Sequence, residues 1–227
     1  VYKRQMYNLD GSEGKMCGNG IRCVGKFLYD HGMVDINEKD EITIETLSGI
    51  KKLKAYTSGG KVNRLRVDMG KAILEPKEIP VLLDGDKVVD RPVEIAGKNY
   101  NITCVSMGNP HCVVFMDDID NLDIETVGPE FENDKLFPER VNTEFVTVLD
   151  DHTIKMRVWE RGSGETWACG TGACAVAVAA CENGFCKKGE DIKIKLKGGD
   201  LIINYTDETV YMTGLSLIHI SEPTRPY

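Results

Sequence analysis

The sequence predicts an α+β protein made of two similar halves, each a helix with a mostly antiparallel sheet. The first observation is an internal repeat. The segment YNLDGSEGKMCGNG at 7–20 aligns without a gap with WERGSGETWACGTG at 159–172, so that Cys17 faces Cys169. The second is that a helix-forming stretch follows each copy, and the third is that alternating apolar and polar residues follow each of those stretches.

The two helical stretches are IRCVGKFLYDHG at 21–32 and ACAVAVAACENG at 173–184. Each ends in a glycine, Gly32 or Gly184, at the same distance from its cysteine. Glycine is favoured just beyond a helix C-terminus, where the backbone turns into the left-handed region. We therefore expect two equivalent helices, each beginning close to its cysteine.

The strand candidates are EITIETL with KVNRLRVDMG in the first copy and DIKIKL with TVYMTG in the second. Further candidates lie between the copies, namely YNITCVSM, HCVVFM and TEFVTVL, and we assign most of them to the second half. The expected domains are 1–72 and 73–214, pseudo-symmetric, each a sheet wrapped around a central helix. Small-molecule sites favour domain interfaces, so the active site is expected in the cleft between the halves.

The two ends of the chain look atypical. The sequence begins at Val1 rather than at methionine, and we expect the N-terminal half to be incomplete. The segment LSLIHISEPTRPY at 215–227 has two prolines and fits neither a helix nor a paired strand, so we expect a non-native tail.

Composition limits the classes of function. The 227 residues are 41% hydrophobic and 28% charged, as in ordinary globular proteins. A net charge of -8 and a pI near 5.1 argue against nucleic-acid and acidic-membrane partners, and favour a small-molecule substrate. The sequence has no apolar run near the roughly 20 residues of a membrane span and no signal peptide, so we expect a cytoplasmic protein.

The eight cysteines are expected to be reduced thiols in that compartment. A zinc site is not expected, because the chain has no C-x-x-C motif and its four histidines are scattered. The candidate catalytic cysteines are Cys17 and Cys169, because each lies in a C-G-x-G motif directly before a predicted helix. Unpaired N–H groups at a helix N-terminus stabilise a thiolate and attract anions, so both thiols are expected to have lowered pKa values and to act as acid–base groups.

Two such motifs in matching registers predict a racemase or epimerase. Inverting an amino-acid α-carbon requires a base on one face and an acid on the other. The N–H groups around Gly18, Asn19, Gly170 and Thr171 could bind the substrate carboxylate as it gains charge, so no pyridoxal cofactor is required. The alternatives from other classes are a non-catalytic carboxylate-binding protein with two buried cysteines, and a redox sensor.

Four ordered segments, MCGNGIRC, GNPHCVVF, PERVNTEF and ERGSGETWACGTGACA, resemble the signature segments of the diaminopimelate epimerases. The resemblance runs from about residue 7 to residue 214. It implies two pseudo-symmetric α/β domains, a homodimer, and a cofactor-independent two-cysteine mechanism. The implied reaction interconverts LL- and meso-diaminopimelate in lysine and peptidoglycan precursor biosynthesis.

The resemblance also implies roles for single residues. Cys17 and Cys169 would transfer the proton, with His111 and Glu160 influencing their protonation. The implied substrate contacts are Asn8, Gly18, Asn19, Asn109, Asn142, Glu160, Arg161, Gly170 and Thr171. Each has an ordinary structural interpretation when taken alone: Asn109 precedes a proline, Glu160 and Arg161 could be a solvated pair, and His111 could be a core histidine.

A proline-type racemase is the alternative within the same superfamily. Its smaller ring substrate needs less polar recognition at the end remote from the cysteines. Asn8, Asn142 and Arg161 favour the diamino diacid, because arginine can grip a carboxylate with two hydrogen bonds.

Overall fold

The computed structural model describes residues 2–3, 17–34 and 41–215. Within these ranges the chain forms three α-helices, a short 3-10 helix and thirteen strands, which confirms the expected α+β class. The helices and strands of the two predicted copies recur in the same order.

The first copy is α1 (Gly18–Asp30) followed by β2 (Glu41–Thr46), β3 (Gly49–Ser58) and β4 (Lys61–Asp68). The second is α3 (Gly170–Glu182) followed by β11 (Asp191–Leu196), β12 (Gly199–Tyr205) and β13 (Val210–Leu215). Both helices have 13 residues, and both are followed by a glycine with positive φ, 63° at Gly32 and 78° at Gly184. The expected equivalence of the helices is confirmed.

The repeat extends to the hydrogen-bonding register. In the first copy β1 (Tyr2–Lys3) runs parallel to β2, with Tyr2 opposite Ile44. In the second, β9 (Thr153–Glu160) runs parallel to β11, with Ile154 opposite Ile194. These four positions correspond in the two copies, so the repeat includes strand pairing as well as sequence.

The segment between the copies adds the rest of the second half. Its elements are a 3-10 helix (Pro76–Glu78), β5 (Arg91–Ile95), β6 (Lys98–Ser106), β7 (Pro110–Phe115), α2 (Ile124–Glu132) and β8 (Asn142–Asp150). The short β10 (Gly164–Thr166) pairs with β9. Strands β6, β7 and β8 were expected from the sequence, whereas α2 was missed because Pro129 and several acidic residues in that helix resemble a turn.

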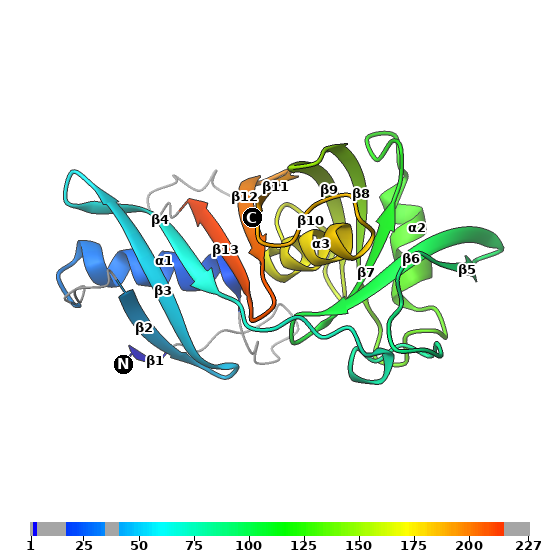
Figure 1. Ribbon diagram of the computed structural model, residues 1–227, viewed down its shortest axis with the longest axis horizontal. Helices are drawn as coiled ribbons and strands as arrows, with labels where there is room; N and C mark the ends of the chain where they lie inside the picture. The colour runs from blue at the N-terminus through cyan, green and yellow to red at the C-terminus, as the bar shows by residue number, and fades with distance from the viewer. Residues whose placement is uncertain (1, 4–16, 35–40, 216–227) are drawn as a thin grey trace, which may run out of the picture.

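One hydrogen-bonded path runs through the sheet in the order β1-β2-β3-β4-β13-β12-β11-β9-β8-β7-β6-β5. The two copies join where β13 pairs antiparallel with β4. Figure 1 shows α1 with β2 to β4 at one end, α2 with β5 and β6 at the other, and α3 between them.

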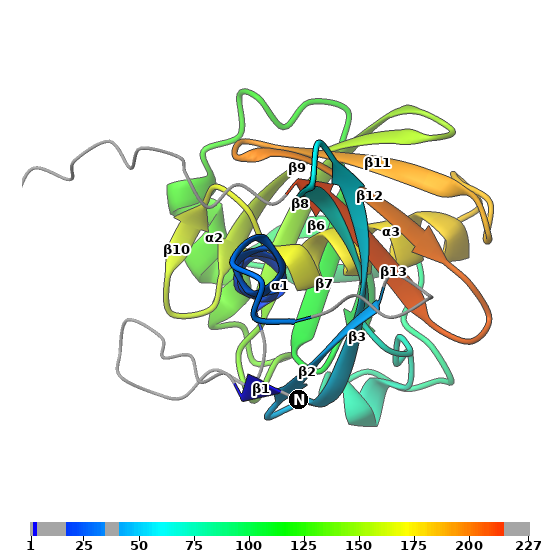
Figure 2. The same ribbon diagram turned by 90° about the vertical axis from the view of Figure 1, so that its left-hand side faces the viewer.

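The two central helices, α1 and α3, are buried to different extents in the hydrophobic core. One face of α1 is buried, including Ile21 and Leu28, whereas every residue from Ala173 to Ala180 of α3 is fully buried. One apolar cluster contains both helices, and a second lies around α2 and strands β5 to β8. In Figure 2, α1 is seen end-on and α3 lies across the view, so the two helices run in different directions. The domain boundary between residues 72 and 73 stays a prediction.

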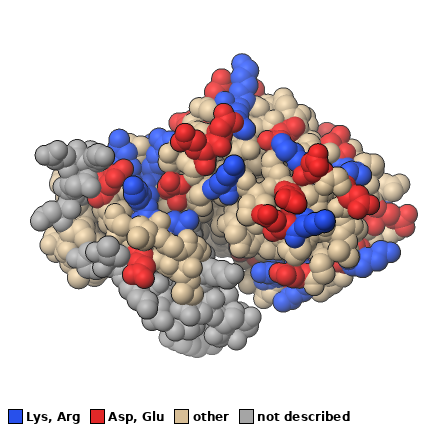
Figure 3. Space-filling model, turned by 60° about the horizontal axis from the view of Figure 1, so that its bottom comes forward, with Lys and Arg blue, Asp and Glu red and all other residues tan. Residues whose placement is uncertain are grey.

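Acidic and basic side chains are interspersed over the described part of the face in Figure 3. None of the described helices is long and apolar enough to cross a membrane.

Candidate active site

Cys17 and Cys169 are the N-cap residues of α1 and α3. Their backbones are nearly identical, with φ/ψ of −132°/116° at Cys17 and −120°/113° at Cys169. Each sulfur accepts a hydrogen bond from the N–H three residues later, at 3.4 Å from Gly20 and 3.3 Å from Gly172. Each thiol thus occupies the place where a helix N-terminus binds an anion or a capping oxygen.

The two helix N-termini meet at their first glycines. A Cβ on Gly18 would lie 3.4 Å from Gly170 Cα and 2.7 Å from Cε of Met212 on β13. A Cβ on Gly170 would lie 3.3 Å from Gly18 Cα. The two glycines favour this close approach, which brings the two predicted carboxylate-binding turns together.

Arg22 lies beneath the first of these turns and was not singled out from the sequence. Its buried guanidinium donates to Gly18 O at 3.0 Å and to Asn19 Oδ1 at 3.0 Å. Burial lowers the pKa of Arg22, which the nearby thiols Cys23, Cys17 and Cys174 partly offset. Its place four residues after Gly18, one helical turn on, is the sequence signal that could have identified it.

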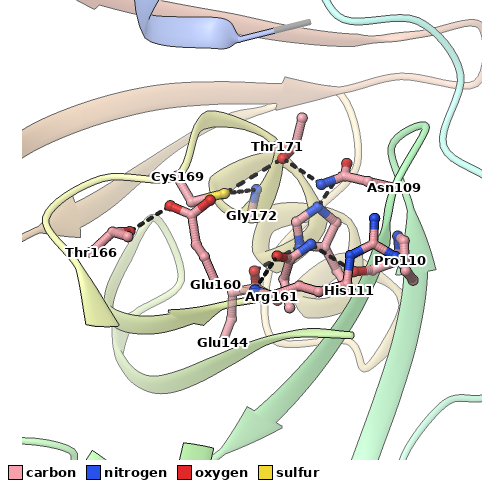
Figure 4. A network of polar contacts seen from close by, with 11 residues as sticks. Asn109, Pro110, His111, Glu144, Glu160, Arg161, Thr166, Cys169, Thr171 and Gly172 are labelled. Carbon is pink, nitrogen blue, oxygen red and sulfur yellow. Dashed lines mark hydrogen bonds and ion pairs between the residues drawn. The ribbon is translucent and has the colours of Figure 1, made fainter. Parts of the chain in front are cut away.

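A chain of polar contacts within the second half leads from Cys169 to Glu144 (Figure 4). The Thr171 hydroxyl lies 3.5 Å from Cys169 Sγ and accepts from Asn109 Nδ2 at 3.3 Å. Asn109 Oδ1 lies 3.1 Å from His111 Nε2, and His111 Nδ1 lies 2.7 Å from Glu144 Oε1. Three of these residues, Asn109, His111 and Thr171, were expected at the site, whereas Glu144 was read only as part of a strand.

Glu160 lies on the other side of Cys169. Its carboxylate accepts from Thr166 Oγ1 at 2.5 Å and is directed toward the sulfur in Figure 4. Glu160 lies at the end of β9, beside the turn that leads through β10 to Cys169. Glu160 therefore lies beside Cys169, and His111 is connected to the same sulfur through Asn109 and Thr171.

The pKa of Cys169 contradicts the sequence-based expectation. We expected the helix N-terminus to lower it, but burial raises the pKa of this thiol well above its ordinary value. The negative charges of Glu160 and Glu144 raise it further, and the hydrogen bonds from Thr171 and Gly172 oppose the shift only in part. Cys169 is only 6% exposed. The desolvation of its sulfur therefore outweighs the stabilisation of a thiolate by the helix N-terminus, and Cys169 is held as the thiol.

Asn142 and Arg161 are placed together by the backbone. The Asn142 side chain donates to Pro110 O at 2.9 Å and accepts from the Arg161 N–H at 2.9 Å. Arg161 donates from Nη1 to Glu139 O at 2.7 Å. Asn142 therefore fixes the turn that carries Arg161, a contact that the sequence did not reveal.

The same turn is anchored from α2. Glu132, buried on that helix, accepts from Trp159 Nε1 at 2.7 Å and from the Gly162 N–H at 2.9 Å. It also pairs with Arg140 at 2.9 Å.

Of the expected site residues, Asn8 lies outside the described residues.

The described residues contain no group of three or more His, Cys, Asp or Glu side chains arranged to hold a metal ion. All eight cysteines are free thiols. Two hollows lie on the outer face of the sheet, away from the cysteines. Their lining residues are Glu41, Lys52, Lys54, Arg66, Asp68 and Tyr211 in one, and Tyr56, Arg64, Arg66, Asp191, Ile202, Asn204 and Thr213 in the other.

Comparison with known structures identifies the fold. A probable proline racemase from Agrobacterium radiobacter superposes with a TM-score of 0.70 at 16% identity, over 99% of this chain and 73% of that chain. A hydroxyproline epimerase from Agrobacterium vitis superposes with a TM-score of 0.70 at 15% identity, over 94% of this chain and 67% of that chain. At these identities the likeness concerns the fold alone.

Comparison of sequences is more specific. Residues 1–75 and 103–218 match the family model described as diaminopimelate epimerase. The diaminopimelate epimerase of Agathobacter rectalis is 51% identical over 94% of this chain and 76% of its own length. That of Desulfovibrio desulfuricans is 52% identical over 93% of this chain and 75% of its own length. With two capping cysteines at meeting helix termini and this identity over nearly its whole length, the chain belongs to the diaminopimelate epimerase family.

Proposed function

We propose that this isomerase interconverts LL- and meso-diaminopimelate by moving a proton between Cys17 and Cys169 across the substrate α-carbon, without a cofactor. The observation that carries the proposal is the meeting of two equivalent helix N-termini, each capped by a cysteine. This pair of cysteine-capped helix N-termini supplies one proton carrier for each face of a single carbon. The name of the relatives at 51% and 52% identity supports the choice of substrate.

The substrate α-carboxylate would lie at the paired N-termini, accepting hydrogen bonds from the N–H groups around Gly18, Asn19, Gly170 and Thr171. The two helix dipoles stabilise the negative charge that spreads onto this carboxylate when the α-proton leaves. Stabilisation that grows toward the transition state is what accelerates the reaction. This electrostatic role replaces the electron sink that pyridoxal provides in other racemases.

In one direction the Cys17 thiolate takes the α-proton and becomes a thiol. The Cys169 thiol gives its proton to the opposite face of the carbanion and becomes a thiolate, so that protons and charge balance. The raised pKa of Cys169 favours the thiol form that this step needs. In the reverse direction the two cysteines exchange roles.

The remote end of the substrate would be bound by Arg161 with Asn109 and Asn142, and with Asn8 from the part of the chain outside the described residues. Asn142 holds the Arg161 backbone, so its contribution includes positioning. A guanidinium suits the second carboxylate of a diacid. The proline-type alternative rests on structures only 15% to 16% identical, whereas the diaminopimelate epimerases exceed 50%.

Three further expectations accompany this function: a homodimer, a cytoplasmic location, and domains that divide near residues 72 and 73. The resemblance to the family supports the first two, and the repeat of α1-β2-β3-β4 in α3-β11-β12-β13 supports the third. Sedimentation equilibrium tests the homodimer, for which a single species of twice the chain mass is expected.

The test of the proposed function is incubation of the protein with LL-diaminopimelate in deuterated water. We expect the meso isomer to form with deuterium at the inverted carbon, while L-proline offered under the same conditions acquires none. Turnover of L-proline without turnover of LL-diaminopimelate would assign the chain to the alternative activity. Exchange of neither substrate would remove the proposal.

A further inference from the structure

Glu144 is a fully buried carboxylate next to the proposed active site. It lies on β8, 0% exposed, between Val113 of β7 and Val158 of β9 in the sheet. A carboxylate in such a place is strongly destabilised unless it is paired. Its Oε1 meets His111 Nδ1 at 2.7 Å, and its Oε2 has no hydrogen-bond partner among the described residues.

The carboxylate also packs against the first turn of α3. A Cβ on Gly172 would lie 2.5 Å from Glu144 Oε1, and Gly172 is the residue whose N–H donates to Cys169 Sγ. Glu144 therefore contacts the turn that holds Cys169 and, through His111, begins the polar chain that ends at the same sulfur.

The directions of the hydrogen bonds in that chain follow from the side-chain chemistry. Asn109 donates from Nδ2 to Thr171, so its Oδ1 faces His111 Nε2 at 3.1 Å. A carbonyl oxygen only accepts, and Nε2 must therefore carry a proton. The Thr171 hydroxyl accepts from Asn109, and its O–H donates to Cys169 Sγ when that sulfur is a thiolate, because a thiolate only accepts.

The proton count of the buried pair follows in turn. With Nε2 protonated, the contact between His111 Nδ1 and Glu144 Oε1 needs one further proton, on either atom. The two placements have the same total charge: imidazolium with carboxylate, or neutral imidazole with carboxylic acid. In both, the pair is neutral and holds two protons.

We propose that Glu144 is a positioning residue for Cys169: it keeps two protons on the His111–Glu144 pair and thereby directs the Thr171 O–H at the Cys169 sulfur. The inference rests on the proposed function, in which Cys169 becomes a thiolate during turnover. A thiolate is stabilised by an O–H donor and by a neutral neighbour. If the pair lost one proton, His111 Nε2 would become an acceptor, Asn109 would have to turn over, and Thr171 would donate to Asn109 instead of Cys169.

The charges around the pair favour the two-proton state. The groups that face Glu144 are His111 of β7, Glu160 of β9, and the thiols Cys112 and Cys169. Burial and the charge of Glu160 raise the pKa of Glu144, whereas His111 lowers it. Burial and the charge of Glu160 therefore oppose a net negative charge on the pair.

The test compares Glu144→Leu with Glu144→Gln. The Gln amide can donate an N–H to His111 Nδ1, as the carboxylic acid does, so Nε2 keeps its proton and kcat for diaminopimelate should stay close to the wild-type value. Leu leaves Nδ1 without a partner and no longer fixes the proton on Nε2, so kcat should fall by about 100-fold, with KM changed less than about twofold. Glu182→Leu, at the far end of α3, is the matched control and should retain the wild-type kcat. Because Glu144 acts through His111, Glu144→Leu should have less than about a twofold further effect on kcat in a His111→Gln background.

A retained kcat in Glu144→Leu, an equal loss in Glu144→Gln, or the same 100-fold loss in the His111→Gln background would overturn the inference. The ring nitrogens of His111 give a readout independent of activity. In 15N NMR of the wild-type protein we expect protons on Nε2 and in the Nδ1–Glu144 contact, and in Glu144→Gln a proton on one nitrogen only. A wild-type ring protonated only at Nδ1 would contradict the proposal even if Glu144→Gln did not fold. Absence of epimerase activity in the wild type would remove the proposed function and leave this spectroscopic result standing.

Discussion

At the scale of single residues, Cys169 shows burial outweighing a helix terminus. The sequence correctly places the thiol before a helix, where a lowered pKa is the usual outcome. The fold then adds desolvation and the carboxylates of Glu160 and Glu144, and the pKa rises instead. The proximity of Cys169 to Glu144 depends on how β7, β8 and α3 pack together, and no local pattern in the sequence predicts that packing.

Arg161 gives a residue-scale prediction about specificity. Its guanidinium is held by the Glu139 carbonyl at 2.7 Å and its backbone by Asn142. We expect Arg161→Lys to raise KM for diaminopimelate about 10-fold, because an ammonium group cannot form the paired contact with the remote carboxylate, while kcat changes little. Steady-state kinetics measure both parameters. A fall in kcat with unchanged KM would place Arg161 in a structural role instead.

At the scale of elements, α2 supports the turn that carries Glu160 and Arg161. Glu132 of this helix bonds to Trp159 and to the Gly162 N–H, and the Trp159 ring covers Gly128. The helix thus connects packing in the second core to the geometry of the proposed substrate site.

Gly128→Ala tests this support. A Cβ there would lie 2.3 to 2.6 Å from atoms of the Trp159 ring, which is enclosed and cannot move away freely. Overpacking of this kind destabilises by roughly 1–3 kcal/mol, so the melting temperature should fall although alanine favours helix. Calorimetry measures the change. An equal or higher melting temperature would show that the ring has room to shift.

The sequence predicted both central helices and two strands of each copy, as well as β6, β7 and β8 between the copies. The helices after Cys17 and Cys169 were found because the repeat supplies two independent copies of each signal. The helix α2 was missed because Pro129 lies within it, and β3 and β12 were not named among the expected strands. The expected site residues near Cys169 were brought together, but Arg22, Glu132 and Glu144 emerged only from the tertiary packing.

At the scale of the whole molecule, α3 is enclosed by strands of the second half, with contacts to β6, β7, β8, β11, β12 and β13. Its buried thiol Cys174 corresponds in the repeat to Arg22 of α1, and the positive charge of Arg22 partly offsets the burial that raises the Cys174 pKa from 9.0 to about 12. A group whose pKa is higher in the folded state contributes stability below its unfolded pKa and loses it as pH rises toward the folded value. The affected window for Cys174 is therefore pH 9 to 12.

Cys174→Ala should reduce the loss of unfolding free energy that occurs between pH 9 and 12. At pH 10 the wild-type thiol is ionised mainly in the unfolded chain, which favours unfolding by roughly 1 kcal/mol relative to pH 7. Urea unfolding of both proteins at pH 7 and pH 10 measures the difference, because the packing lost with the sulfur affects both pH values equally. An identical decrease in both proteins would show that Cys174 ionises as readily in the folded state.

The most direct test of the two-cysteine account is α-hydrogen exchange in Cys17→Ser and Cys169→Ser, followed separately with LL- and meso-diaminopimelate in deuterated water. Each variant should lose epimerisation by at least about 100-fold, because one face of the α-carbon has no proton carrier. The thiol that remains should still exchange the α-hydrogen of one isomer with retention of configuration, and the two variants should exchange opposite isomers. Exchange of both isomers by a single variant, or epimerisation near the wild-type rate, would contradict a mechanism with one cysteine on each face.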